Sequence, residues 1–278
     1  MSRSAFLLAL LAGIVSLSFP PLATAQSTYD LYGSARADGL GWATTAAPLA
    51  RGVHANPAAS AAATRHTATF YAQQAFGLRV LRYGAVSVVA PFRWATAVGG
   101  ASTFGFEDYR EIHFSAGGAR SLSLGTTRSI HLGLLLRYHH TRIAGYGSAG
   151  ALALNPGLLV EILPSLHLGA HATNVNGATL AADEPLPRTF ALGLAYEAHD
   201  DVRILADLYK DMAFPATVRA GVEVSPIDAL ALRAGVTTTP TRFTGGVGVS
   251  VGPLEAHVAA RQHQQLGWSP SASLHLYW

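Results

Sequence analysis

Residues 129–143 read SIHLGLLLRYHHTRI, and two kinds of side chain alternate along this stretch. One set of positions is apolar, namely Ile130, Leu132, Leu134, Leu136 and Tyr138, and the other is small or polar, namely His131, Gly133, Arg137 and His139. Successive side chains of a β-strand point to opposite faces, so the two sets lie on opposite faces of one strand. Because the apolar set is rich in leucine, we predict that it faces lipid.

The same alternation recurs along the chain after residue 64. Segments of about ten residues, each ended by Gly, Pro, Asn or Asp, are the sequence signature of a membrane β-barrel. The segments lie at 65–75, 80–90, 93–106, 110–122, 129–143, 149–163, 166–175, 187–198, 202–212, 215–226, 229–239, 242–251, 254–264 and 270–278. The predicted fold class is therefore all-β, a ~14-stranded antiparallel transmembrane β-barrel over residues 65–278 with a short N-terminal plug segment. The alternative is a soluble β-sandwich, but its outward faces would be polar.

An even number of strands places both ends of the barrel on the periplasmic side. Short connections such as Pro91-Phe92 and Gly252-Pro253 then fall on that side, and the longest connection, 176–186, falls on the outer side. The last segment ends on Tyr277 and Trp278, an aromatic end of the kind that bacterial barrel-assembly machinery reads. We predict that Tyr277 and Trp278 form an assembly signal, with this machinery and outer-membrane lipid as partners.

The N-terminal residues have the pattern of an export signal. Arg3 supplies a positive charge, residues 6–17 are apolar, and Ala23-Thr24-Ala25 is an A-x-A-like cleavage site. A membrane anchor would need a longer apolar stretch and different flanks. We predict a secretory signal peptide at 1–25, a plug or hatch-like segment at 26–64, and localisation in the outer membrane of a Gram-negative type of cell.

The composition excludes several kinds of chemistry. The 278 residues contain no cysteine, so disulfides, thiolate metal sites and a cysteine nucleophile are absent. The net charge of +3 comes from scattered arginines rather than a basic run, and we expect no nucleic acid as a partner. The glycines at 145, 147 and 150 match a dinucleotide fingerprint, but they lie between two predicted strands and no helix follows.

No Gly-x-Ser-x-Gly nucleophile motif occurs, and the twelve histidines are best explained as lumenal and interfacial residues, although His199-Asp200-Asp201 in a turn could bind a cation weakly. A catalytic triad is recognised in space rather than by sequence order, so the sequence leaves that possibility open. We expect no enzymatic activity, no metal and no cofactor.

Alternation directs a set of charged and polar side chains into the barrel: Arg137, Arg203, Asp207, Arg219, Glu223, Arg233, Glu255, His257 and Arg261. Charges in a wet lumen cost little, whereas an arginine at the lipid midplane costs about 2–4 kcal/mol. One interpretation is a constriction that sets selectivity. The other, which we favour, is that Asp207 with Arg219 and Glu223 with Arg233 pair across strands, brace the wall and hold the plug.

Asn56 and Pro57 lie in the predicted plug. Proline biases the preceding residue toward extended backbone, and asparagine side chains bond to nearby backbone groups, so the pair can form a rigid turn. The two residues are candidates for gating, or they simply turn the chain. We hypothesise that Asn56 caps a hairpin of the plug against the lumen-facing charges.

Two stretches resemble known outer-membrane proteins. RGVHANPA at 51–58 resembles the N-P-A element in the N-terminal region of the FadL-like superfamily. YHHTRIAGYGSAGALALNPGLL at 138–159, followed by LPSLHLGAHATNVN at 163–176, resembles the PorV/PorQ-type branch. This resemblance implies a fourteen-stranded barrel that is not an enzyme.

The resemblance also implies one of two functions. PorV-like members receive folded cargo proteins in type IX secretion, whereas FadL-like members admit small hydrophobic molecules, with the N-terminal segment as a hatch. We predict a role in type IX-like protein secretion with secreted cargo as partner, and take passive transport of hydrophobic small molecules as the alternative. A lateral opening would favour transport, and the glycines at 99, 100, 117 and 118 could weaken the strands enough to allow one.

Overall fold

The computed structural model describes residues 33–48, 56–124, 128–181 and 184–278. The predicted signal peptide at 1–25 and part of the predicted plug lie outside the described residues.

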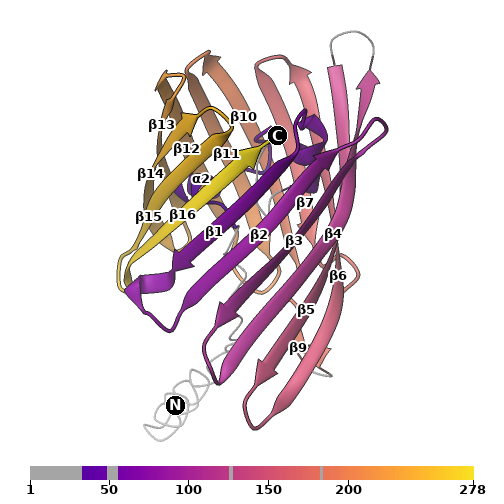
Figure 1. Ribbon diagram of the computed structural model, residues 1–278, viewed down its shortest axis with the longest axis vertical. Helices are drawn as coiled ribbons and strands as arrows, with labels where there is room; N and C mark the ends of the chain where they lie inside the picture. Colours follow the sequence, from indigo (N-terminus) through magenta and orange to yellow (C-terminus); the bar gives the residue numbers. More distant parts are fainter. Residues whose placement is uncertain (1–32, 49–55, 125–127, 182–183) are drawn as a thin grey trace, which may run out of the picture.

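Fourteen strands form a closed antiparallel barrel (Figure 1). The strands are β1 (Thr67–Gln74), β2 (Arg82–Pro91), β3 (Thr96–Gly105), β4 (Tyr109–Leu124), β5 (Arg128–Ile143), β6 (Gly147–Leu163), β7 (Leu166–Thr173), β10 (Thr189–His199), β11 (Val202–Asp211), β12 (Thr217–Ile227), β13 (Leu230–Thr238), β14 (Thr241–Val251), β15 (Leu254–His263) and β16 (Gly267–Tyr277). Each pairs with its neighbours in this order, and β1 closes the barrel against β16. The predicted fold class is confirmed, including the number of strands.

Two short elements lie in the loop between β7 and β10. They are β8 (Thr179–Ala181) and β9 (Glu184–Pro185), which pair with each other and not with the barrel. Leu180 and Leu186 of this loop pack with Ala151 and Ala153 of β6.

The two faces of the wall differ as the alternation predicts. On β5, Leu132, Leu134 and Leu136 are 40–48% exposed, whereas Arg137 and His139 are 5% and 6% exposed. A closed barrel satisfies its backbone internally and meets hydrocarbon with apolar side chains, which is how strands cross a membrane. The fold is that of an outer-membrane protein.

The interior of the barrel contains residues from the N-terminal part of the chain. Helix α2 (Ala35–Gly39) contacts β13 to β16, and the 3₁₀-helix η1 (Pro57–Ala62) contacts β3 to β6. We call residues 33–48 and 56–63 the inner segment. Its apolar residues form the largest buried cluster with side chains of the wall: Leu40, Ala43, Ala46, Ala47, Ala58 and Ala59 with Leu159, Ala195 and Leu205.

Glycines on the inner face of the wall let the inner segment approach the strand backbones. A Cβ atom on Gly133 would lie 2.4 Å from the nitrogen of Ala58, and one on Gly235 would lie 2.3 Å from the nitrogen of Gly41. Both distances are too short for a real Cβ contact, so these positions require glycine. Similar close approaches occur at Gly157, Gly169, Gly193 and Gly221.

The glycines at 99, 100, 117 and 118 do not interrupt the wall. Strands β3 and β4 pair from Thr96 opposite Ala119 to Gly105 opposite Arg110 without a register shift. The opening that these glycines suggested is absent from the described strands.

None of the described helices is long and apolar enough to cross a membrane.

Candidate functional site in the lumen and the wall

Glu223 of β12 connects the inner segment to the wall. Arg36 on α2 donates hydrogen bonds to both carboxylate oxygens, at 2.8 and 2.7 Å. Arg233 of β13 donates to the same carboxylate at 2.6 Å, and Arg203 of β11 donates at 3.1 Å. Hydrogen bonds between ionised partners are about twice as strong as neutral ones. The predicted pair of Glu223 and Arg233 therefore also anchors α2.

A polar cavity of about 430 Å³ adjoins this cluster. Glu197 lines it and accepts a hydrogen bond from Arg203 at 2.6 Å. The nitrogens of Arg233 and His257 approach within 3.1 Å. One continuous polar network therefore joins five side chains next to α2: Glu197, Arg203, Glu223, Arg233 and His257.

Asp207 of β11 also contacts the inner segment. Its carboxylate accepts hydrogen bonds from the backbone N–H of Thr45 at 3.0 Å and from the Thr45 hydroxyl at 2.7 Å. Arg219 lies opposite Asp207 in the β11–β12 ladder, with its guanidinium carbon 3.6 Å from the ring centroid of Tyr209. Asp207 is thus a second point at which the wall holds the inner segment.

Trp42 of the inner segment lies among three arginines. The guanidinium carbons of Arg219, Arg242 and Arg261 lie 5.5, 5.4 and 4.4 Å from its ring, within the range of cation–π attraction. Trp42 itself is 2% exposed. Trp42 therefore attracts three arginines of the wall to its aromatic face.

Asp38 connects Trp42 to β1. It accepts a hydrogen bond from the Trp42 indole N–H at 2.8 Å and one from the Tyr71 hydroxyl at 2.7 Å. Asp38 and Trp42 were not predicted as site residues because the segment around them shows no alternation. The one available signal was a tryptophan four residues after an aspartate in a stretch rich in Ala and Gly.

All nine residues predicted to face the lumen stand at inward positions of their strands. Besides those above, Arg137 donates to the Ser115 hydroxyl at 3.2 Å, and Glu255 accepts from the Tyr277 hydroxyl at 2.7 Å. Their contacts join neighbouring strands and the inner segment. We therefore retain bracing of the wall and of this segment as their proposed role.

Asn56 bonds to backbone groups on both sides of the gap between the inner segment and the wall. Its side-chain amide donates to the carbonyl oxygens of Thr45 at 2.8 Å and Leu158 at 2.9 Å. Its oxygen accepts from the N–H of Ala58 at 3.1 Å and caps η1, where Pro57 is the first residue. These partners are backbone groups rather than the lumen-facing charges of our hypothesis.

We expect Asn56→Ala to lower the free energy of unfolding by about 1–3 kcal/mol, because buried carbonyls and a helix cap lose their partner. Urea unfolding in lipid vesicles, followed by tryptophan fluorescence, measures this. Ser60→Ala is the matched control, since buried Ser60 makes one local bond, to the carbonyl of Pro57. If Asn56→Ala changes neither stability nor permeability, Asn56 does not hold the inner segment.

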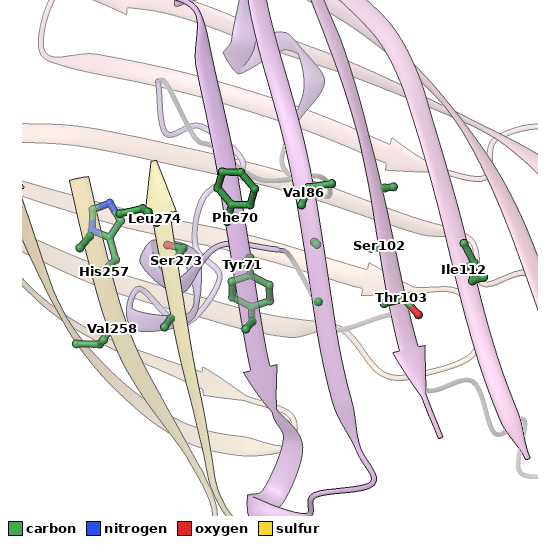
Figure 2. Close-up of a pocket in the computed structure, with 16 residues that line it drawn as sticks. Phe70, Tyr71, Val86, Ser102, Thr103, Ile112, His257, Val258, Ser273 and Leu274 are labelled. Atoms are coloured by element: carbon green, nitrogen blue, oxygen red, sulfur yellow. The ribbon is translucent and has the colours of Figure 1, made fainter. Parts of the chain in front are cut away.

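An apolar pocket of about 660 Å³ lies in the wall where the first and last strands meet (Figure 2). Small outward residues form its floor: Ala72, Gly84, Ala101, Ala256 and Ala272. Larger outward residues surround them: Phe70, Val86, Ile112, Val258 and Leu274. No charged Asp, Glu, Lys or Arg side chain lines this pocket.

The pocket is not evident from the sequence because it is built from β1 to β4 and from β15 and β16, which are far apart in the chain. The available signal was a small residue at the same height on several lipid-facing strands. The pocket is open to the lipid phase, where hydrophobic molecules partition.

The two residues of the predicted assembly signal point to opposite faces. Tyr277 is 5% exposed and turned inward, whereas Trp278 is 60% exposed and stacks on the ring of His66 at 5.7 Å. Of the two, Trp278 is the accessible side chain. Its role in assembly stays a prediction.

Among the described residues, no group of three or more His, Asp or Glu is arranged to hold a metal ion.

No protein-family model matches the sequence, and no curated protein sequence is significantly similar to it. Solved structures do match. A deltaS2 mutant of the TodX monoaromatic hydrocarbon channel has a TM-score of 0.65 and 13% identity, covering 90% of this chain and 99% of that one. The toluene transporter TbuX of Ralstonia pickettii has a TM-score of 0.60 and 12% identity, covering 90% and 98%.

A FadL homologue of Pseudomonas aeruginosa has a TM-score of 0.54 and 11% identity, covering 89% of this chain and 98% of that one. Identities this low establish the fold alone. The chain therefore shares its fold with outer-membrane channels of the FadL type.

Proposed function

We propose that this protein is a passive outer-membrane channel for small, neutral hydrophobic molecules. The observation that carries the proposal is the apolar pocket in the wall of a barrel whose fold is shared by hydrocarbon channels. This is the second of the two functions that the sequence suggested.

The pocket favours a neutral molecule. None of its lining residues is Lys or Arg, so a carboxylate entering it would lose its hydration without gaining a Lys or Arg partner. Burying an unpaired charge is far more costly than burying apolar surface. A small hydrocarbon meets no such penalty.

The interior of the barrel disfavours passage of hydrophilic solutes. The inner segment occupies it, and side chains such as Arg219, Trp42 and Asp207 are only 2–3% exposed. Protein secretion of the PorV type gains no support from the contacts described or from the named neighbours. Those neighbours are channels, which also favours transport over catalysis.

Uptake of toluene by cells that lack or carry the protein tests the proposal. We expect faster uptake in cells that carry it and no gain for decanoate. Gly84→Phe should lower toluene uptake severalfold, because a Cβ on Gly84 meets no atom closer than 4.0 Å and the ring would fill the pocket.

Ala206→Phe is the matched control. Ala206 is exposed on the outward face of β11, and no residue of β11 lines the pocket. Toluene uptake that does not depend on the protein would contradict the proposed channel function. If the set of surface proteins also changes in the deletion strain, a role in protein secretion would be favoured instead.

A further inference from the structure

In the described part of the chain, the outer half of β6 pairs with a strand on one side only. β6 pairs with β5 from Ile143 opposite Gly147 to Ile130 opposite Val160. Its ladder with β7 runs only from Leu163 opposite Leu166 to Gly157 opposite His171. Pro156, which has no N–H to donate, stands where the second ladder stops. Figure 1 shows the β5–β6 hairpin extending past the neighbouring strands at the lower end of the barrel.

Part of this open edge is bonded by residues that imitate a strand. The N–H of Val175 donates to the carbonyl of Leu154 at 3.0 Å. The side-chain amide of Asn176 accepts from the N–H of Leu154 and donates to the carbonyl of Leu152, both at 2.9 Å. A carboxamide offers the same donor and acceptor as a peptide group. The edge thus already accepts peptide-like partners at Leu152 and Leu154.

Among the described residues, no strand pairs with the next positions along the same edge. Backbone groups of alternate residues point to the same side of a strand, so those of Ser148 and Gly150 point the same way as those of Leu152 and Leu154. Both residues are exposed, and among the described residues none bonds to them on this side. On β5, Arg142 and His140 lie opposite them, which places this part of the hairpin in water beyond the lipid.

The free edge carries no charge, proline or bulge, and the loop between β7 and β10 packs on the inward side chain of Ala151 beside it. Natural sheets guard exposed edges with lysine, proline, a bulge or a covering loop. Residues 147–151 read GSAGA, are uncharged, and pair with β5 without a bulge. Their small side chains leave the backbone accessible. The ring of Tyr138, which is 43% exposed, lies over Gly150 and provides an apolar surface beside the edge.

We propose that the edge of β6 at residues 147–151 binds an extended polypeptide segment from outside the cell, which adds a strand beside β6 and continues the line begun by Val175 and Asn176. Backbone hydrogen bonds supply the affinity. The ring of Tyr138 selects an apolar or aromatic side chain at the position beside Gly150.

A second copy in the same membrane fits the edge poorly. Two copies in one bilayer are related by an axis along the membrane normal, which carries a strand into a parallel orientation. Because barrel strands tilt by about 35–45°, the two edges would also cross at roughly twice that angle. An extended peptide has no such restriction.

Fluorescence anisotropy tests the proposal on the full chain in lipid nanodiscs. The probe is a fluorescein-labelled peptide TVYVT, and its matched partner carries N-methyl groups on alternate amides, which removes donors on one edge. We expect the first peptide to bind and the second to fail. Absence of binding by the first, or equal binding by both, would overturn the proposal.

Two variants locate the site. Ser148→Pro removes an N–H that faces no strand, a position at which sheets tolerate proline, and should weaken peptide binding about tenfold. Ser148→Ala keeps the N–H and should bind as the parent does. Equal affinity of the two variants contradicts the site. Dimers that disappear in Ser148→Pro would instead assign the edge to a second copy.

Discussion

Glu223→Ala is expected to lower the free energy of unfolding of the barrel by about 3–5 kcal/mol. Glu223 is the carboxylate on which Arg36, Arg203 and Arg233 converge, and its side chain is 9% exposed. Removing one partner of a buried ion pair leaves the other charges unpaired, and this costs more than the pair contributed. Urea unfolding in lipid vesicles, followed by tryptophan fluorescence, measures the loss.

Glu197→Ala is the matched control for this prediction. Glu197 also bonds to Arg203, but its side chain is 35% exposed, and such pairs contribute only about 0–1 kcal/mol. If Glu223→Ala does not assemble, Glu223→Gln keeps the volume and removes only the charge. A loss at Glu223 no larger than that at Glu197 would show that this carboxylate does not anchor the inner segment.

Removing the charge of Glu223 should also open the lumen. Glu223 of β12 bonds to Arg36 of α2 and to arginines of the two neighbouring strands, β11 and β13. We expect a higher ion conductance of Glu223→Gln in planar bilayers than of the parent protein. Unchanged conductance with lowered stability would mean that other contacts, such as those of Asp207 with Thr45, hold the segment in place.

The second large effect is expected from Gly235→Ala. Its Cβ atom would lie 2.3 Å from the nitrogen of Gly41 and 2.4 Å from the carbonyl carbon of Leu40, and neither backbone can yield as a flexible side chain does. Overpacking of this kind costs about 1–3 kcal/mol and sometimes more. We expect the inner segment to shift from the wall and the barrel to admit small sugars.

Swelling of liposomes in arabinose measures that permeability. Gly245→Ala on the adjacent strand is the control, because its Cβ atom would face outward with no atom nearer than 3.8 Å. Slow swelling of both variants, with equal stability, would mean that the inner segment is not seated against β13. Rapid swelling of Gly235→Ala alone would identify it as the barrier to hydrophilic solutes.

The motifs behind the PorV/PorQ resemblance have a structural explanation in this chain. The asparagine of LNPGLL, Asn155, accepts a hydrogen bond from the N–H of Asn174 at 2.9 Å. Asn176 closes the next part of the same seam between β6 and β7. These residues complete the wall where the ladder between β6 and β7 ends. They therefore favoured a branch of the superfamily for which the named structural neighbours provide no support.

The sequence by itself determined the strands, their number and the face that each side chain occupies. These follow from alternation, which is local: each strand separates lipid from the interior, so every second residue reports its own surroundings. Only the tertiary structure decided what the interior contains and what the outer wall can bind. Arg36 meets Glu223 across 187 positions, and the apolar pocket joins strands from both ends of the chain. Such contacts form because closure of the barrel brings residues that are distant in the sequence next to one another. A local sequence pattern contains no information about which distant residues become neighbours.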